Sequence, residues 1–307
     1  MADCALLHWL PAFNRATHRL HRITVNAADG FELHATLFGD SKTARAGVLI
    51  ASAMGVEQAY YADFAHWLAA QGFWVVTFDY RGIGQSRPDS LRRSLRGLEA
   101  SVMSWARHDA AAIVDFMAER LGDRPLLWVG HSLGGQILGL LDRPERIRAI
   151  MTVAAGSGYW RDYVPALRRF APALWYAIVP LVLPLCGYFP GRRLGMIGDV
   201  PHGVMRQWRA WCLDPEYLFG VEDRAWRVTY AQLTQPILSL SFTDDEYLSE
   251  RNIESLHTFY AGAVREMRRL APSDVGADRI GHFGFFRRRQ GATLWPIVGD
   301  WLAASIR

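Results

Sequence analysis

Apolar residues along the chain fall into two alternating patterns, and each pattern predicts a different element. Short runs of consecutive apolar residues are typical of buried strands, and they occur at residues 47–51, 73–78, 126–129, 149–154 and 237–242. Between these runs, periodic apolar positions predict helices at residues 58–70, 102–120 and 249–260. The alternation predicts an α/β fold with a mostly parallel central sheet and helices on both of its faces.

Further strands and helices are predicted along the rest of the chain. Residues 23–25 and 31–38 are expected to form two strands joined at Asp29-Gly30, a dipeptide that favours a two-residue hairpin. Further elements are predicted as a helix at 133–141, a strand at 264–270 and a last helix at 292–306. The alternation stops after Gly156 and resumes near residue 234. We therefore expect a core made of residues 1–156 and 234–307, with residues 157–233 as an inserted helical cap.

Within the expected cap, residues 170–191 carry no charge, and such a stretch is long enough to suggest a membrane span. We expect no stable span. Pro172, Pro180, Pro184 and Pro190 are expected to break a continuous helix. A span would also place the strands at 126–129 and 237–242 on opposite sides of the membrane, although one sheet needs both. No second span is predicted that would bring the chain back. A cap packed over the active site is the favoured interpretation, and interfacial lipid contact is the alternative.

Composition narrows the classes of function. Half of the 307 residues are hydrophobic and 21% are charged, which is typical of a globular protein. The net charge of +4 comes from scattered arginines without interleaved aromatic residues, so no nucleic-acid partner is expected. Cys4, Cys186 and Cys212 have no metal-ligand spacing and fit a reducing compartment. Residues 5–13 are apolar but lack a basic leader and a cleavage site, so we expect a cytoplasmic protein without a signal peptide.

The strongest chemical signal is the sequence Gly130-His131-Ser132-Leu133-Gly134, which lies between a predicted buried strand and a predicted helix. In this setting G-x-S-x-G is typical of a nucleophile elbow, a tight turn that presents the serine above the carboxyl end of a sheet. Glycines flank the turn because it leaves almost no room for side chains. The backbone N–H of Leu133, at the start of the helix, would face a developing oxyanion. His131 is expected to be a packed neighbour that points away from the serine.

A serine nucleophile needs a base, and the base needs an acid that orients it. His282 lies between glycines after the last predicted strand, at the same sheet edge as Ser132, and is the expected base. The strand at 237–242 leads into Asp244, Asp245 and Glu246. We expect Asp245 to orient His282, with Asp244 as the competing candidate. Asp244 would otherwise shape the turn, and Glu246 is expected to be solvated.

The second oxyanion donor is expected from the loop after the strand at 47–51. This loop reads Ser52-Ala53-Met54-Gly55, and its small residues allow the backbone to approach a substrate closely. The backbone N–H of Met54 is therefore predicted to act together with that of Leu133. Met54 could equally be only a wall of the pocket, since a pliable thioether suits varied acyl groups.

Together with the segment at residues 79–86, these motifs resemble the α/β-hydrolase superfamily over residues 22–306. The segment reads Asp79-Tyr80-Arg81-Gly82-Ile83-Gly84-Gln85-Ser86. Within the superfamily the chain resembles bacterial predicted hydrolases related to the serine-aminopeptidase-like and monoglyceride-lipase-like group. The resemblance implies an α/β-hydrolase fold and hydrolysis of an acyl ester or amide through an acyl-enzyme. It also implies structural roles for Asp79 and Arg81.

The sequence therefore predicts a serine esterase that uses Ser132, Asp245 and His282 as its catalytic residues. Its expected partner is a small acyl substrate, and the aromatic residues of the cap favour a hydrophobic acyl group. Those residues are Tyr159, Trp160, Trp175, Tyr176, Trp208 and Trp211. Equally, they could simply hold the cap to the core. No metal and no cofactor are expected, because the histidines form no H-E-x-x-H pattern and no Walker loop is present. The alternatives are an acyltransferase, an amide or peptide hydrolase with the same triad, and a catalytically silent protein that binds a small ligand.

Overall fold

The computed structural model describes residues 21–306. The expectations about the leader at residues 5–13 and about Cys4 lie outside the described residues. The two other cysteines, Cys186 and Cys212, are free thiols.

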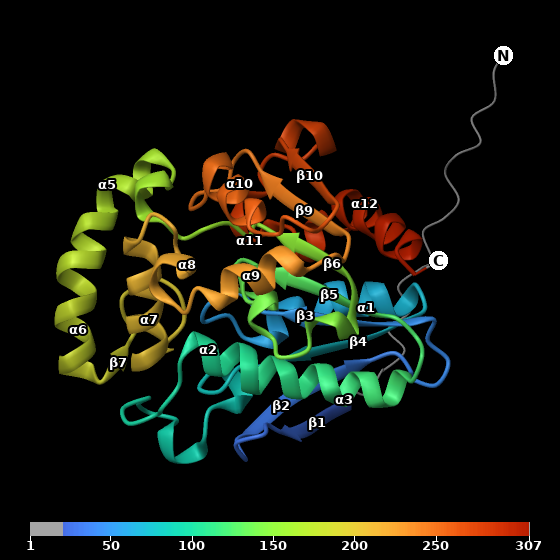
Figure 1. The fold of residues 1–307 in the computed structure, drawn as a ribbon, viewed down its shortest axis with the longest axis horizontal. Coiled ribbons are helices and arrows are strands. Elements are labelled where there is room, and N and C mark those ends of the chain that lie inside the picture. Colours follow the sequence, from blue (N-terminus) through green and yellow to red (C-terminus); the bar gives the residue numbers. More distant parts are fainter. Residues whose placement is uncertain (1–20, 307) are drawn as a thin grey trace.

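An eight-stranded sheet forms the centre of the molecule, with the strand order β1-β2-β4-β3-β5-β6-β9-β10 (Figure 1). The strands are β1 (His21–Asn26), β2 (Glu32–Phe38), β3 (Ala46–Ala51), β4 (Phe73–Phe78), β5 (Leu126–His131), β6 (Ile147–Val153), β9 (Ile237–Phe242) and β10 (Arg265–Leu270). Strand β2 pairs antiparallel with both β1 and β4, and all the other pairs are parallel. The predicted fold class is confirmed.

Helices cover both faces of the sheet. The helices of the core are α1 (Ala62–Ala70), α2 (Val102–Ser104), α3 (Ala111–Leu121), α4 (Leu133–Gln136), α10 (Glu250–Thr258), α11 (Gly281–Gly284) and α12 (Gly291–Ala304). A π-helical segment, Trp105–Ala110, joins α2 to α3. Because successive strand residues point to opposite faces, Val48 and Ile50 pack with α1 and α12, whereas Leu49 and Ala51 pack on the side of α3.

Two predicted elements differ in detail from the structure. The predicted helix at 133–141 is only the short α4 followed by a 3₁₀ turn, Leu138–Leu140. The hairpin between β1 and β2 is not a two-residue turn, because the last paired residues are Asn26 and Glu32. Gly30 has a φ of 81°, so it supplies the left-handed residue that a longer hairpin loop needs.

The chain between β6 and β9 leaves the sheet and forms the remaining helices. These are α5 (Pro165–Ala173), α6 (Val179–Cys186), α7 (His202–Leu213), α8 (Leu218–Val221) and α9 (Ala225–Gln232), and a two-stranded ribbon pairs β7 (Tyr188–Phe189) with β8 (Val200–Pro201). Figure 1 shows α5, α6 and α7 beyond the end of the sheet toward which the arrow of β9 points. We call residues 157–233 the cap.

The expectation that prolines break the apolar stretch of the cap is wrong. A single helix of 22 residues runs over Pro165–Cys186, and by length and composition it could cross a membrane. A π-helical turn, Leu174–Ile178, lies between Pro172 and Pro180 and widens the helix where the regular hydrogen-bond ladder is interrupted. The helix stops at Gly187, whose φ is 77°, so Pro190 lies beyond its end.

Candidate active site

Ser132 occupies a strained turn between β5 and α4. Its φ of 51° and ψ of −114° are unfavourable for a residue with a side chain, and they cost about 1–3 kcal/mol. A Cβ at Gly130 would lie 2.4 Å from the carbonyl oxygen of Gly134, and a Cβ at Gly134 would lie 2.2 Å from that of Ala51. Only glycine fits at both positions, so the sequence motif forms the sharp elbow that it predicts.

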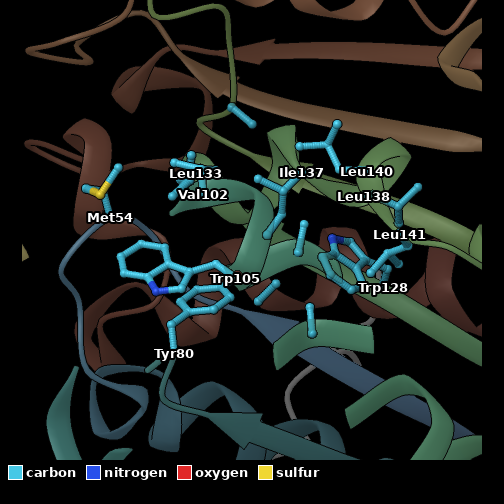
Figure 2. Packing of buried hydrophobic residues seen from close by; sticks show 14 of the residues in the cluster. Met54, Tyr80, Val102, Trp105, Trp128, Leu133, Ile137, Leu138, Leu140 and Leu141 are labelled. Carbon is cyan, nitrogen blue, oxygen red and sulfur yellow. The ribbon is translucent and has the colours of Figure 1, made fainter. Parts of the chain in front are cut away.

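The strand and the helix on either side of the elbow are fixed by buried contacts. The indole Nε1 of Trp128 donates a hydrogen bond to the carbonyl oxygen of Gly134 at 2.9 Å. Figure 2 shows Trp128, Leu133 and Met54 among the side chains of one apolar cluster, together with the stacked rings of Tyr80 and Trp105. Packing of this kind holds the strained Ser132 in place.

His282 is the first side chain of α11 and is paired with Asp245. The distance from His282 Nδ1 to Asp245 Oδ2 is 2.8 Å, and both residues are about 95% buried (4% and 5% exposed). Asp245 Oδ1 accepts two further hydrogen bonds, from the backbone N–H groups of Tyr247 at 2.8 Å and Leu248 at 3.0 Å. A carboxylate held in this way fixes the proton on Nδ1, which leaves Nε2 free to act as a base.

The other two carboxylates position the loop that carries His282. Asp244 accepts hydrogen bonds from the backbone N–H groups of Ile280 at 2.8 Å and Gly281 at 3.0 Å. Glu246 was expected to be solvated, and it also has a contact that was not expected, because its Oε2 accepts the backbone N–H of His282 at 2.9 Å. The side chain is still partly exposed, and its other oxygen lies 3.5 Å from Arg279.

His131 is packed beside the site and has two buried hydrogen-bond partners. Its Nδ1 lies 2.9 Å from the hydroxyl of Tyr61, and its Nε2 lies 3.0 Å from the carbonyl oxygen of His282. Because a carbonyl oxygen can only accept, Nε2 of His131 donates to His282, and the unprotonated Nδ1 accepts from the Tyr61 hydroxyl. That hydroxyl itself accepts the backbone N–H of Ala53 at 2.9 Å. Burial lowers the pKa of His131 well below its usual value, and the neighbouring His282 lowers it further. His131 is therefore neutral, and it links the loop at Ala53 to the loop at His282.

The two predicted oxyanion donors come from the start of α4 and from the loop after β3. Leu133 is the first residue of α4, where backbone N–H groups have no intrahelical acceptor. Met54 follows Ala53 directly, in the loop after β3, and no acceptor within residues 21–306 takes up its backbone N–H. Both side chains are buried in the same apolar cluster. Their geometry is compatible with oxyanion binding, which stays a prediction.

Sequence reasoning missed Tyr61 as a contributor to this site and treated His131 only as a neighbour. Tyr61 lies at the end of a 3₁₀ turn, Gln58–Tyr61, which precedes α1. It is separated from His131 by 70 residues, and no motif connects them. The segment at 79–86 behaves as the resemblance implies. Asp79 accepts backbone N–H groups of Gln58 and Gln85, and Arg81 pairs with Asp29 and Asp109.

Most aromatic residues of the cap take part in its internal packing. Trp175 lies edge-to-face against Trp208, with ring centroids 5.2 Å apart. Trp208 donates to the hydroxyl of Tyr217, which in turn donates to Gln136 Oε1 at 2.8 Å, just after the elbow. Trp211 donates to Glu222, whereas Tyr176 is 59% exposed. The cap is therefore tied to the core through Gln136, four residues after Ser132.

A groove of about 1100 Å³ lies beside this site and not over it. Its walls include Gly55 of the loop after Met54, together with polar residues such as His34, Glu57, Arg87 and Arg192. Ser132, Asp245 and His282 do not line it. Because Arg87 and Arg192 are already paired with Asp199 and Glu57, we assign no role to this groove.

Comparisons with known proteins agree with this fold. Residues 42–189, just under half of the chain, match the family described as serine aminopeptidase, S33. An uncharacterised protein of Salmonella typhi, YfhR, is 30% identical over 149 residues, which are 45% of this chain and 49% of that relative. The chain thus matches about half the length of this curated relative.

Solved structures resemble the chain over nearly its whole length. A soluble variant of monoglyceride lipase from Saccharomyces cerevisiae is 16% identical, with a TM-score of 0.66 over 96% of this chain and 98% of that one. A carboxyl esterase from Bacillus coagulans is 12% identical, with a TM-score of 0.62 over 94% and 99% of the two chains. Residues 42–189 therefore resemble the serine aminopeptidase family, and the chain has the α/β-hydrolase fold that these structures share. The predicted fold is confirmed, and the roles of the individual site residues stay predictions.

Proposed function

We propose that this α/β-hydrolase is a serine esterase that cleaves an acyl ester through a covalent acyl-enzyme. The observation that carries the proposal is the buried pair of His282 and Asp245, whose imidazole lies 5.3 Å, between ring centroids, from His131, the residue before the strained Ser132. A neutral imidazole whose Nδ1 proton is held by a carboxylate can take a proton at Nε2. A serine hydroxyl needs such a base to become a nucleophile.

In the proposed reaction, the hydroxyl oxygen of Ser132 attacks the ester carbonyl while His282 takes its proton. The backbone N–H groups of Met54 and Leu133 stabilise the oxyanion, and each donor of this type contributes about 3–4 kcal/mol. Collapse of the tetrahedral intermediate breaks the ester bond, and His282 passes its proton to the departing alcohol. Water, activated by His282, then attacks the acyl-enzyme and releases the acid.

The apolar side chains around the elbow support a hydrophobic acyl group as the substrate. Met54, Leu133, Val102 and Trp105 belong to one buried cluster next to the elbow (Figure 2). An acyl chain placed against such side chains would gain about 0.8 kcal/mol for each methylene that leaves water. We therefore expect longer p-nitrophenyl esters to be cleaved with a lower KM than p-nitrophenyl acetate.

The decisive experiment is labelling with a fluorophosphonate probe, followed by assay with p-nitrophenyl esters. We expect the wild-type protein to be labelled and Ser132→Ala to be neither labelled nor active, because the alanine removes the nucleophile. Ser255→Ala, on helix α10, is a matched control and should retain labelling and activity. Labelling that survives Ser132→Ala would overturn the proposal. Transfer of the acyl group to an added alcohol, in place of release as free acid, would identify an acyltransferase.

A further inference from the structure

The outer side of the helix Pro165–Cys186 is apolar and exposed. Its inner side packs into the cap through residues such as Ala171, Leu174, Val179 and Leu183, which are buried. On the opposite side the large apolar side chains are accessible to solvent. Tyr176 is 59% exposed, Leu181 is 63% exposed and Leu185 is 74% exposed, and Phe170 is also exposed. We call these four residues the outer face.

The outer face is long, and arginines flank its helix in the sequence. A helix of 22 residues extends over about 33 Å. Residues 163–198 contain Arg168, Arg169, Arg192 and Arg193 and no acidic residue. Arg192 pairs with Glu57, whereas the structure shows no ion pair for the other three arginines within the part of the chain that it describes. In the sequence, two arginines therefore precede the apolar stretch at residues 170–191, and two follow it.

The fold requires this helix to lie along a surface and not to cross a membrane. Strands β6 and β9 precede and follow the cap, and they are direct neighbours in the sheet, with Ile150 paired to Ile237. Because β6 and β9 belong to one sheet, both ends of the cap must lie on the same side of any membrane. The buried inner side of the helix is also already packed against the rest of the cap. Only the outer face is available to a partner.

We propose that the outer face docks on an anionic lipid bilayer, with the helix parallel to the membrane plane. Exposed apolar side chains along one side of a helix insert into the boundary between headgroups and acyl chains, and flanking arginines bind lipid phosphates. A second copy of the chain is a poorer partner. In a parallel pair, Arg168 and Arg169 would face the same two residues of the second copy, and residues 163–198 contain no acidic residue to neutralise them. In an antiparallel pair they would face the end of the helix that Arg192 and Arg193 follow in the sequence.

Docking in this orientation would bring the cap side of the molecule to the membrane. Figure 1 shows α5 and α6 as the outermost elements beyond the end of the sheet at which β9 stops. Ser132 follows the end of β5, which runs parallel to β6 and, through it, to β9. The elbow therefore lies at the sheet edge that the cap separates from the bilayer. The inference concerns binding and does not depend on the proposed catalysis.

The test is co-sedimentation of the full chain with lipid vesicles, in the Ser132→Ala background so that hydrolysis cannot alter the lipids. We expect binding to vesicles of equal parts phosphatidylcholine and phosphatidylglycerol, with weaker binding to phosphatidylcholine alone and at high salt. Leu181→Glu/Leu185→Glu should weaken binding about tenfold or more, because charged side chains cannot enter the apolar layer. Arg168→Gln/Arg169→Gln should weaken binding only to the vesicles with phosphatidylglycerol, by about tenfold.

The matched control is Val264→Glu/Met267→Glu, which makes the same charge change at two exposed apolar residues outside the cap. This variant should bind vesicles within about twofold of the parent chain. The proposal is overturned if the parent chain does not bind anionic vesicles, or if Leu181→Glu/Leu185→Glu and Val264→Glu/Met267→Glu lose binding equally. A lipid-free dimer in light scattering that Leu181→Glu/Leu185→Glu dissociates would assign the outer face to a second copy. The fluorophosphonate test of Ser132 is independent of all these outcomes.

Discussion

Three consecutive carboxylates after β9 illustrate how a residue's role depends on its contacts. Asp245 faces the imidazole of His282, Asp244 holds the backbone of Ile280 and Gly281, and Glu246 holds the backbone N–H of His282. All three act on the same loop. Only Asp245 contacts the ring that would carry the proton.

This division of roles predicts different effects of two conservative substitutions. Asp245→Asn should lower kcat about 10³- to 10⁴-fold, because an amide no longer holds the reactive tautomer or stabilises the imidazolium. Asp244→Asn keeps an oxygen that can accept one of its two backbone hydrogen bonds, and it should lower kcat by about tenfold or less. Steady-state kinetics with a p-nitrophenyl ester measures both. A larger loss in Asp244→Asn than in Asp245→Asn would contradict the assignment of the orienting acid.

At the scale of elements, a buried polar contact joins β6 to α10. His257 on α10 donates from Nδ1 to the carbonyl oxygen of Ile253 at 2.7 Å, and its Nε2 lies 2.9 Å from the hydroxyl of Thr152 on β6. Burial lowers the pKa of His257 to about 4, and the positive charge of Arg265 acts in the same direction. Protonation would replace the bond to Thr152 with a buried charge.

The lowered pKa of His257 predicts acid sensitivity. Because the pKa of about 4 in the folded protein lies below the usual histidine value of 6.5, the unfolded chain binds the proton more readily. The contribution of neutral His257 to the free energy of unfolding is fully present above pH 6.5. About 3 kcal/mol should be lost as the pH falls to about 4. Urea unfolding at several pH values measures this loss. His257→Gln cannot take up the proton, so its stability should fall less steeply with acid.

An equally steep decline in His257→Gln and in the wild-type protein would show that other groups determine the acid sensitivity. His131 is expected to leave some residual slope in both proteins, because burial lowers its pKa as well. The test is therefore the difference between wild type and His257→Gln in how steeply the free energy of unfolding changes with pH.

At the scale of the whole molecule, one chain of hydrogen bonds connects segments that are far apart in sequence. It runs from the backbone N–H of Ala53 through Tyr61 and His131 to the carbonyl oxygen of His282. The loop with the proposed oxyanion donor and the loop with the proposed base are thus fixed to each other. Neither loop is positioned by its own sequence alone.

Removing the Tyr61 hydroxyl from this chain of hydrogen bonds should affect catalysis more than substrate binding. Tyr61→Phe leaves the N–H of Ala53 and Nδ1 of His131 without a partner, so we expect kcat to fall about tenfold with an unchanged KM. The cost in stability should be about 1–3 kcal/mol, measured by urea unfolding. The control is Tyr163→Phe, because the Tyr163 hydroxyl contacts Cys212 in the cap. This variant should keep its kcat. A loss of stability in Tyr61→Phe without a change in kcat would reduce Tyr61 to a packing role.

The sequence alone determined the local features of this protein. Consecutive apolar runs defined the buried strands, because parallel strands covered on both faces must be apolar throughout. The glycines at 130 and 134 defined the elbow, since the turn excludes any Cβ. The order of serine, acid and histidine along the chain then indicated the superfamily.

The tertiary structure decided what depends on contacts between distant segments. It decided that Asp245 and not Asp244 meets His282, that Tyr61 joins the site, and that the helix of the cap stays continuous through its prolines. It also decided which side of that helix remains exposed. Local sequence preferences are set by neighbouring residues, whereas these features depend on side chains brought together across as many as 151 positions of the chain, as His131 and His282 are.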